Sequence, residues 1–485
     1  MKRGLRGGYL KLLSNRELES IHMASLEVLE DTGMRCESEI ILKAFREMGA
    51  NVDEKEKNVK IPQHLVKEAL GKAPSQFVLC GRLRENDILL EGSRVYFGLG
   101  GTPTPYIRDL ETGEIRRPTA RDMAEATKLG DALENIDFIM SIAGAFDVPY
   151  QLEYVVEFKT LFENTSKPIV YSAPGKVNAE LVLEMAAAIA GGLDELRRRP
   201  ILSLYSETAS PLTFTRENEN MLIFAEAGIP ITLGPAPIAG ATGPVTIAGS
   251  AVVSNAENLA AITLIQHTNP GTPIVYACWA AIMDPLTGRV AYAAPEFALS
   301  GNILCAQMAS YYKLPCFGFG GCSDSKAPDA QAGAEVMMMM LTAALSGVNL
   351  IHDCGYLAGG SAGSLEMAVI CNEVIGMVKR IVRGIWVSDE SLAVDVIKEV
   401  GPANHYLTHK HTLKHVRGEL YVPKLFNRKP ERAWVKEGRK WIHQKAREKA
   451  KEILAEHKPE PLPAQVDEKL KEIVRKGEEV LAKAT

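Results

Sequence analysis

Short apolar segments alternate with longer amphipathic stretches through the middle of the chain. Each apolar segment is followed by a loop of small residues and then by a stretch long enough for a helix. Strands that are buried on both faces read as continuous apolar runs, and their alternation with helices predicts a parallel sheet. The eight segments are Val95–Gly100, Asp137–Ala143, Pro168–Ser172, Ile201–Ser206, Ile229–Leu233, Pro273–Ala277, Pro315–Phe319 and Asn349–His352. Eight such units predict an α/β fold, a (β/α)8 TIM barrel with its chemistry in the loops after the strands.

The barrel is expected over residues 95–385, between two further regions. Residues 1–94 read as N-terminal helices and a small β-sheet, with a capping box of Ser14 and Glu17 at the start of the first helix. Residues 14–75 are expected to be mainly helical. Residues 386–485 are polar and helical, and they end in a charged helix over Gln465–Lys483. A tail this polar should pack on the barrel or on a partner, which suits a homo-oligomer.

Composition narrows the class of protein. The 485 residues carry a net charge of −5, which argues against a nucleic-acid partner. No segment is long and apolar enough to cross a bilayer, so no membrane association is expected. The eight cysteines show no disulfide spacing, and reduced thiols in a cytoplasmic enzyme are the simpler interpretation.

Aromatic residues gather near the predicted strand ends, although they form only 6% of the chain. If the barrel closes, these rings can surround one cavity. Ring faces attract a quaternary ammonium, a cation that cannot donate a hydrogen bond. Any single ring could equally be core packing, because aromatics dominate core burial. The candidates for a substrate cage are Tyr96, Phe97, Tyr205, Phe319 and Tyr356.

Few charged residues lie near the predicted strand ends. Glu207 and Asp324 could offset a substrate cation, and either could instead bond loop amides. His352 is the candidate for a polar contact to a substrate carboxylate or to an approaching partner, and the alternative is a satisfied core histidine. Gly359 and Gly360 open a loop whose amides could bind a carboxylate, or they could serve a tight turn.

Four segments carry a family resemblance. They are Gly318–Lys326, Asp329–Gly333, Gly347–Asp353 and His405–Thr412. Together they resemble the trimethylamine methyltransferase superfamily over nearly the whole chain. The resemblance implies a barrel that moves a methyl group from a methylamine to Co(I) of a separate corrinoid protein. The founding trimethylamine enzymes carry pyrrolysine, whereas this chain contains only the twenty standard residues. It is therefore similar to the non-pyrrolysine branch, which uses quaternary amines such as glycine betaine, proline betaine, carnitine or γ-butyrobetaine.

The resulting hypothesis is a methyltransferase that acts on a quaternary amine, with glycine betaine the first choice. Its partner is a cognate corrinoid protein, the corrinoid is bound by that partner and not by this chain, and His352 is the candidate catalytic residue. No metal site is expected. Two alternatives stay open. One is a zinc-dependent thiol or alcohol methyltransferase, because His352, Cys278, Cys322 and Cys354 follow strands. The other is a non-catalytic betaine-binding protein.

Overall fold

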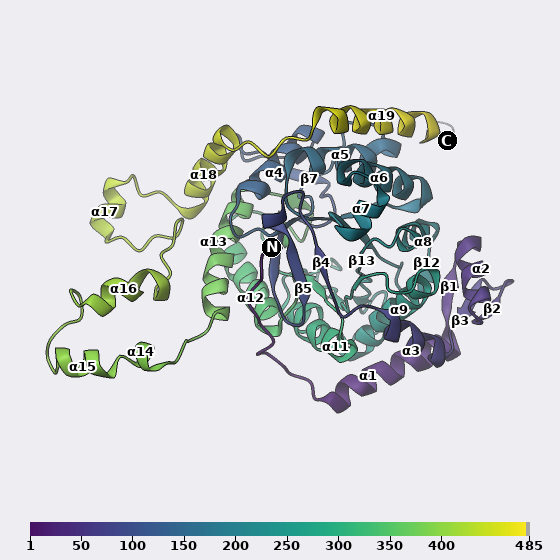
Figure 1. Cartoon of the computed structure of the whole chain (residues 1–485), viewed down its shortest axis with the longest axis horizontal. Helices are drawn as coiled ribbons and strands as arrows, with labels where there is room; N and C mark the ends of the chain where they lie inside the picture. The colour runs from purple at the N-terminus through teal and green to yellow at the C-terminus, as the bar shows by residue number, and fades with distance from the viewer. Residues whose placement is uncertain (482–485) are drawn as a thin grey trace.

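A closed barrel of parallel strands forms the centre of the molecule (Figure 1). The computed structural model describes residues 1–481. Seven pairings join the strands in chain order, and the bridge between Tyr276 and Cys316 closes the ring. The prediction of eight strands and a TIM barrel is confirmed. The strands are β6 (Tyr96–Leu99), β9 (Phe138–Ile139), β10 (Ile169–Ser172), β11 (Leu202–Ser206), β13 (Ile231–Leu233), β15 (Ile274–Val275), β17 (Phe317–Phe319) and β18 (Leu350–Cys354).

A helix follows every barrel strand and packs on the outside of the ring. The strands are buried on both faces, which explains why they are apolar throughout. The eight helices are α4 (Ala120–Ala132), α5 (Glu153–Asn164), α6 (Gly175–Ala190), α8 (Glu219–Glu226), α9 (Ile247–Thr268), α11 (Cys305–Tyr312), α12 (Ala330–Ser346) and α13 (Leu365–Val382). The short helices α7 (Leu193–Arg198) and α10 (Pro295–Phe297) lie in the connections.

A β-hairpin closes the N-terminal end of the barrel. Strands β4 (Gln76–Leu79) and β5 (Ile88–Glu91) pair antiparallel, within residues 1–94 where a small β-sheet is expected. The hydroxyl of Tyr96, at the start of β6, donates to the carbonyl of Leu89 and accepts from the amide of Gly4. The hairpin and the first residues of the chain therefore cover this end, and the opposite end is left for the loops after the strands.

The N-terminal region contains a second small sheet, formed among residues that were expected to be helical. Helix α1 (Asn15–Glu27) begins with the predicted Ser14–Glu17 capping box, and α2 (Glu39–Glu47) and α3 (Gln63–Lys72) follow. Between them lie β1 (Met34–Cys36), β2 (Asn51–Asp53) and β3 (Asn58–Lys60). Strand β1 also pairs with β12 (Thr213–Phe214), from the loop after β11. The expectation that residues 14–75 are mainly helical is wrong here, because three-residue strands carry almost no periodic signal.

Short strands organise the loops at the C-terminal end of the barrel. Strand β7 (Tyr106–Arg108) pairs with β8 (Ile115–Arg116) and with β20 (Ala362–Gly363), which in turn pairs with β19 (Tyr356–Leu357). Strands β14 (Ile238–Ala239) and β16 (Ala281–Ile282) form a second pair. These pairings fix the loops that follow β6, β13, β15 and β18.

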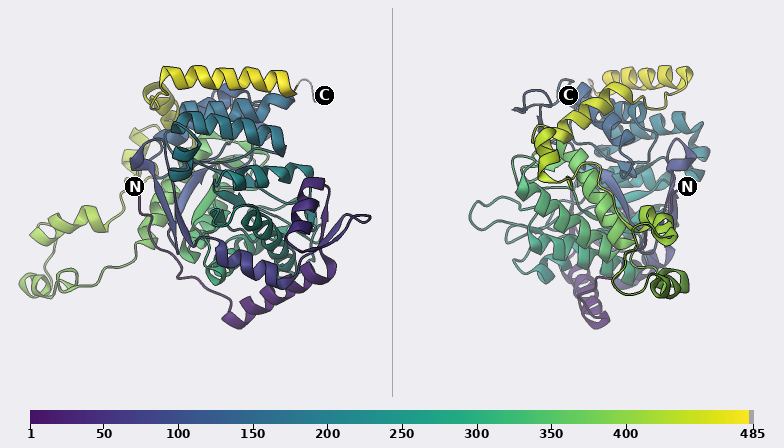
Figure 2. Two further views of the ribbon diagram at one scale, coloured as in Figure 1. Left: turned by 45° about the vertical axis from the view of Figure 1, so that its right-hand side comes forward. Right: turned by 90° about the vertical axis from the view of Figure 1, so that its left-hand side faces the viewer.

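The chain after the barrel has two parts of different character. Helix α18 (Ile442–Glu456) packs on α13 and α4, and α19 (Ala464–Leu481) packs on α5 and α6. Helices α14 (Asp389–Leu392), α15 (Val394–Val400), α16 (Lys410–Glu419) and α17 (Glu431–Lys436) project sideways (Figures 1 and 2). The last two residues of the predicted helix Gln465–Lys483 lie outside the described residues. Over residues 1–481, no helix has the length and apolar character needed to cross a membrane.

Candidate functional site

A cluster of rings occupies the barrel near the C-terminal ends of β15, β17 and β18. Phe319 lies with its ring centroid 4.4 Å from Trp279 and 4.7 Å from His352. His352 stacks on Phe317 at 4.0 Å. Tyr205 from β11 reaches the same cluster, 5.8 Å from Phe317. The structure thus brings three of the predicted site residues, Tyr205, Phe319 and His352, into one group.

Two more rings cover this cluster from a loop. Tyr292 lies 6.1 Å from Phe319, and Phe297 lies 4.3 Å from Phe319. Burial raises the pKa of the Tyr292 hydroxyl, and the nearby charges of Asp353, Glu207 and Asp324 raise it further. Three carboxyl groups therefore lie near enough to Tyr292 to affect the pKa of its hydroxyl.

His352 is neutral in this environment. Its Nδ1 lies 2.7 Å from the carbonyl oxygen of Gly318, so Nδ1 carries the hydrogen and donates it. Burial lowers the pKa of the imidazole to about 3, which leaves Nε2 without a hydrogen near neutral pH. Nε2 lies 3.3 Å from Oδ1 of Asp353. An unprotonated nitrogen facing a carboxyl group is stable only if the carboxyl group holds a proton.

Asp353 is the most unusual carboxyl group at this end of the barrel. It is 4% exposed, and burial raises its pKa well above the ordinary value. Within residues 1–481 no lysine or arginine forms an ion pair with it. Its backbone has φ of +72°, a left-handed conformation that costs energy in a residue other than glycine. Strain and an uncompensated buried acid together mark a functional position.

Gly101 leaves the room that Asp353 needs. It follows β6, and a Cβ atom placed on it would lie 2.6 Å from Oδ1 of Asp353 and 3.3 Å from the His352 ring. Any side chain at this position would displace both groups.

Tyr205 and Glu207 form a second polar pair at the end of β11. The Tyr205 hydroxyl donates to Oε2 of Glu207 at 2.7 Å. Desolvation raises the pKa of Glu207, although its side chain keeps solvent-accessible surface. The Glu207 side chain is exposed, so a small ligand can reach it. Gly234 permits this arrangement, because a Cβ there would lie 2.4 Å from the Tyr205 ring.

The loop that carries Glu207 is held by another acid, Glu257 of α9. Its carboxyl group accepts hydrogen bonds from the amide of Leu212 and the hydroxyls of Thr208 and Ser210. Burial raises the pKa of Glu257 to about 7. Glu257 accepts three hydrogen bonds from the loop after β11, so its role is to hold that loop against α9.

The predicted residues after β17 and β18 form the wall beside Tyr292. Asp324 is half-buried, accepts from the amide of Ala293 at 3.3 Å, and has a pKa raised by desolvation. Gly359 and Gly360 have φ of +63° and +75°. A Cβ on Gly359 would lie 3.1 Å from Oδ1 of Asp324, and one on Gly360 would touch Tyr292 and Tyr356. Both glycines therefore allow the loop to approach the site closely.

Tyr356 borders the site, and its hydroxyl lies beside the His352–Asp353 pair, because a Cβ placed on Gly101 would lie 3.1 Å from this oxygen and 2.6 Å from Oδ1 of Asp353. That hydroxyl contacts the carbonyl oxygens of Thr102 and Ser141, in the loops after β6 and β9. Tyr356 thus links three loops at this end of the barrel, and its ring is 4% exposed.

Two predicted cage residues lie elsewhere. Tyr96 stands at the N-terminal end of β6, where its hydroxyl contacts Gly4 and Leu89. Phe97 alternates to the opposite face of the strand, and Nζ of Lys379 from α13 lies 5.6 Å from its ring centroid. The structure does not bring either ring to the cluster around Phe319.

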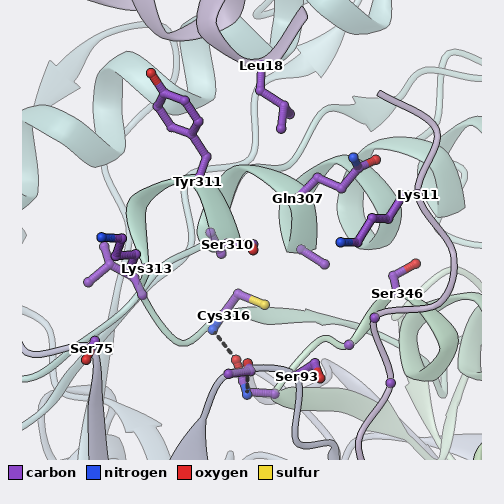
Figure 3. Close-up of a pocket in the computed structure, with 18 of the residues that line it drawn as sticks. Lys11, Leu18, Ser75, Ser93, Gln307, Ser310, Tyr311, Lys313, Cys316 and Ser346 are labelled. Atoms are coloured by element: carbon purple, nitrogen blue, oxygen red, sulfur yellow. Dashed lines mark hydrogen bonds between the residues drawn. The ribbon is translucent and has the colours of Figure 1, made fainter. Parts of the chain in front are cut away.

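A separate hollow lies at the N-terminal end of the barrel (Figure 3). It has a volume of about 640 Å³ and lies between the N-terminal segment and the starts of β17 and β18. Its lining includes Lys11, Gln307, Lys313, Cys316 and Asn349. It does not contain the predicted site residues.

Metal ligation was one of the open alternatives. Across the part of the chain that the structure describes, no group of three His, Cys, Asp or Glu side chains is placed to hold a metal ion. Cys278, Cys322 and Cys354 are buried and free.

Sequence reasoning missed part of the site. Asp353 directly follows His352 in the sequence, but nothing there gives it a role, because a positive φ leaves no mark in the sequence. Trp279 lies shortly after a predicted strand, and no signal sets it apart from other aromatic residues in such positions. Tyr292 and Phe297 lie far beyond β15, and only the folded loop returns them to the cluster.

Comparison with known proteins identifies the family. A family model described as trimethylamine methyltransferase (MTTB) matches residues 4–481. Trimethylamine methyltransferase MttB of Desulfitobacterium hafniense (strain DSM 10664 / DCB-2) is 40% identical over 467 residues, which cover 96% of this chain and 94% of that protein. Glycine betaine methyltransferase of D. hafniense (strain Y51) is 34% identical over 473 residues, with 97% and 98% covered. Trimethylamine methyltransferase MttB of Methanosarcina thermophila is 35% identical over 467 residues, with 95% and 96% covered. The chain therefore belongs to the trimethylamine methyltransferase family and is a methyltransferase.

Proposed function

We propose that this methyltransferase takes a methyl group from a quaternary amine, glycine betaine first among them, and transfers it to Co(I) of a separate corrinoid protein. The observation that carries the proposal is the combination of rings and uncompensated acids at one end of the barrel. Trp279, Tyr292 and Phe319 supply ring faces, and Glu207 and Asp353 supply carboxyl groups whose raised pKa values a bound cation would lower. A relative named glycine betaine methyltransferase covers nearly the whole chain.

The two acids suit a cation that cannot donate hydrogen bonds. In the described chain, Glu207 has no ion-pair partner and Asp353 faces only His352. A quaternary ammonium is held by ring faces and by nearby negative charge, with no directional bond. Its arrival would favour the ionised forms of both acids, because an opposite charge lowers a carboxyl pKa.

The chemistry asks the protein mainly for orientation. The electron pair of Co(I) forms the new bond to the methyl carbon, and the C–N bond breaks with its electrons staying on nitrogen. The leaving group is a neutral tertiary amine, so no general acid is required. The barrel supplies a fixed direction for the methyl group, which is where binding energy accelerates such a transfer.

His352 cannot bind a substrate carboxylate through a positive charge, because its imidazole is neutral. With Nδ1 donating to Gly318 and a pKa of about 3, its Nε2 can only accept. A substrate carboxylate needs a donor, so its contact must come from groups other than His352. The amide of Gly359 is not free for it, because it already donates to the carbonyl of Ser323. We place His352 as the partner that controls the proton and orientation of Asp353.

The corrinoid partner should dock on the C-terminal end of the barrel, because cobalt must reach the methyl group directly. Three exposed apolar side chains stand on connections at this end. Tyr150 is 75% exposed, Val245 76% and Leu286 93%. They follow β9, β13 and β15 respectively, which places them around the site. The chain itself is proposed to bind no corrinoid, to work in the cytoplasm, and to form a homo-oligomer.

The substrate class is tested by methyl transfer in a defined mixture. The protein is incubated with its cognate corrinoid protein, a reductive activase and one amine at a time, and the cobalt spectrum is followed. We expect conversion of Co(I) to methyl-Co(III) with a quaternary amine and not with trimethylamine. Conversion with trimethylamine alone would overturn the substrate class. Binding of a betaine without transfer to any corrinoid acceptor would support the betaine-binding alternative.

His352 is tested in the same mixture. We expect His352→Ala to lower the transfer rate at least tenfold, because Asp353 loses the group that faces it. An unchanged rate would remove His352 from the site.

A further inference from the structure

The hollow at the N-terminal end of the barrel has the size of a ligand site (Figure 3). Its volume of about 640 Å³ lies within the range of about 300–1,000 Å³ that small-molecule sites occupy. Its walls come from the N-terminal segment (residues 7–18), the β4–β5 hairpin, the end of α11 and the connection from α12 to β18. The ring cluster lies at the opposite end of the barrel, so a ligand of this hollow is a different molecule from the methyl donor.

Hydrogen bonds fix the walls of this hollow. The side chain of Gln307, which is 6% exposed, accepts from the amides of Leu12 and Leu13 and donates to the carbonyl of Leu13. The side chain of Asn349 donates to the carbonyl of Gly92 at 3.0 Å. The N-terminal segment and the end of the hairpin are therefore held in place, and the hollow between them is part of the folded structure.

Two lysines of the hollow have no counter-charge. Lys11 and Lys313 line it, and within residues 1–481 neither ammonium group forms an ion pair or a hydrogen bond. Glu91 is the acidic residue of the lining, and it is already paired with Arg94 at 2.9 Å. Helices α11 and α12 end at the hollow and bring a partial negative charge of about one half each, which two full lysine charges outweigh. The hollow is therefore positive, although the whole chain carries −5.

Hydroxyl groups without partners accompany the two lysines. The serines that line the hollow make no side-chain hydrogen bond in the described part of the chain; they are Ser75, Ser93, Ser310 and Ser346. Ser346 is 7% exposed, and its Oγ is buried without a hydrogen-bond partner among the described residues. A buried hydroxyl with no partner costs free energy, so this oxygen indicates a ligand atom as its partner.

The free cations and hydroxyls form two sets, one at each side of the hollow. Figure 3 shows Ser346 on the side of Lys11 and Ser75 on the side of Lys313, with Ser310 and Cys316 between the two lysines. Each set offers one cation together with a hydroxyl donor. This combination suits a phosphate group, because its three terminal oxygens are strong acceptors and its charge matches a lysine. A molecule that fills the hollow would meet one set at each end.

We propose that this hollow is a second ligand site, and that it binds a small organic bisphosphate with one phosphate group near Lys11 and the other near Lys313. A molecule with a single phosphate would leave one lysine without a counter-charge, so the affinity should grow with each phosphate group. This inference does not depend on the methyl donor or on the corrinoid partner, because no residue of the ring cluster lines the hollow.

Calorimetry at constant ionic strength tests the site with a matched series of probes. Fructose 1,6-bisphosphate, fructose 6-phosphate and fructose share a skeleton and differ in the number of phosphate groups. We expect the bisphosphate to bind the full-length protein at least about 10-fold more tightly than the monophosphate, and fructose not to bind. Equal affinity for the two phosphorylated sugars, or binding of neither, overturns the proposal.

A pair of variants assigns the binding to the two lysines. In Lys11→Gln/Lys313→Gln, the Kd for fructose 1,6-bisphosphate should rise at least about 10-fold, because both charge contacts are lost. The matched control is Lys55→Gln/Lys67→Gln, which removes two exposed lysines that form no ion pair among the described residues and do not line the hollow. The control should keep the wild-type Kd. An equal rise in both variants, or no rise in the first, contradicts the proposal.

A footprint on the wild-type protein covers a variant that does not fold. The lysines are acetylated with a water-soluble activated ester, and the rate at each lysine is read by mass spectrometry. With fructose 1,6-bisphosphate at ten times its Kd, acetylation of Lys11 and Lys313 should slow about 10-fold, because about nine-tenths of the sites are occupied. The rates at Lys55 and Lys67 should not change. Equal protection of all four lysines, or protection of none, overturns the proposal.

Discussion

Each end of the barrel contains a buried aspartate, and the surroundings of the two are opposite in kind. At the N-terminal side, Asp137 lies 3.4 Å from Nζ of Lys2 and 3.3 Å from Nζ of Lys379, and it accepts from the amide of Phe97. At the C-terminal end, Asp353 faces only an unprotonated imidazole nitrogen, and its backbone is left-handed. An acid surrounded by cations and donors stabilises the fold. An acid left without them makes a place for a cation that arrives from outside.

The largest contrast between the two ends should appear when Asp353 and Asp137 are each replaced by asparagine. Asp353→Asn keeps the size of the side chain and tolerates a left-handed backbone, but it removes the charge that a substrate cation meets. We expect kcat/KM for methyl transfer to fall about 100-fold, in line with the loss of a buried charge contact. The free energy of unfolding should stay equal or rise, because an uncompensated buried carboxyl group does not stabilise the fold.

Asp137→Asn is the matched control at the other end. It leaves Lys2 and Lys379 without their counter-charge, so the free energy of unfolding should drop by about 2 kcal/mol. The kcat/KM of the folded protein should not change. If Asp353→Asn destabilises and Asp137→Asn lowers methyl transfer, the contrast between the two ends is wrong.

Glu207→Gln should have the next largest effect. We expect the Kd for a quaternary amine to rise about tenfold, a loss of ~1.4 kcal/mol. The raised pKa values also predict the direction in which binding of a quaternary amine changes with pH. Only an ionised carboxylate attracts a cation, and the pKa values of Glu207 and Asp353 are both raised. Wild-type binding should therefore strengthen as pH rises through these pKa values, and Glu207→Gln should remove one of the two titrations. Calorimetry across pH would show this, and an unaltered pH profile would exclude Glu207 from the site.

Gly234→Ala tests the position of Tyr205 without touching a charge. The new methyl group would lie 2.4 Å from the Tyr205 ring, so the ring must move and its bond to Glu207 must break. We expect a drop in kcat/KM of about 5- to 10-fold. Gly333→Ala in α12 is the control, because no atom lies within 4 Å of its added Cβ. Equal rates for the two variants would count against the Tyr205–Glu207 pair.

The smallest effect on binding should come from a single ring. Phe319→Leu keeps the apolar volume and removes one ring face, so Kd should rise about 2- to 5-fold. Phe214→Leu removes a ring of the N-terminal sheet that packs 5.6 Å from Phe45, and it should lower stability without changing Kd. A Phe319→Leu variant that binds as tightly as wild type would mean that Phe319 is packing alone.

Much of the barrel was predictable because its signal is local and repeated. Each strand is a continuous apolar run, and each is followed by a helix, so the eight units could be placed from the sequence. The short strands β1, β2 and β3 could not, because they depend on pairing with each other and with β12 from a distant loop.

The site was predictable only in outline. Tyr205, Glu207 and His352 could be predicted because they lie at or just after strand ends. Excluding Tyr96 and Phe97 required the strand register and the direction of each side chain. Tyr292 reaches the site through a loop, and Asp353 is set apart by its backbone conformation and by the absence of a basic neighbour in the described chain. These are properties of the folded protein and not of any local pattern.

A matched pair of ligands tests the central claim most directly. Glycine betaine and 3,3-dimethylbutanoate have the same shape and carboxylate, but only glycine betaine carries the positive nitrogen. We predict that glycine betaine binds wild-type protein at least ~10-fold more tightly by calorimetry, and that Asp353→Asn reduces this preference. Equal affinity of the wild type for the two ligands would contradict the account.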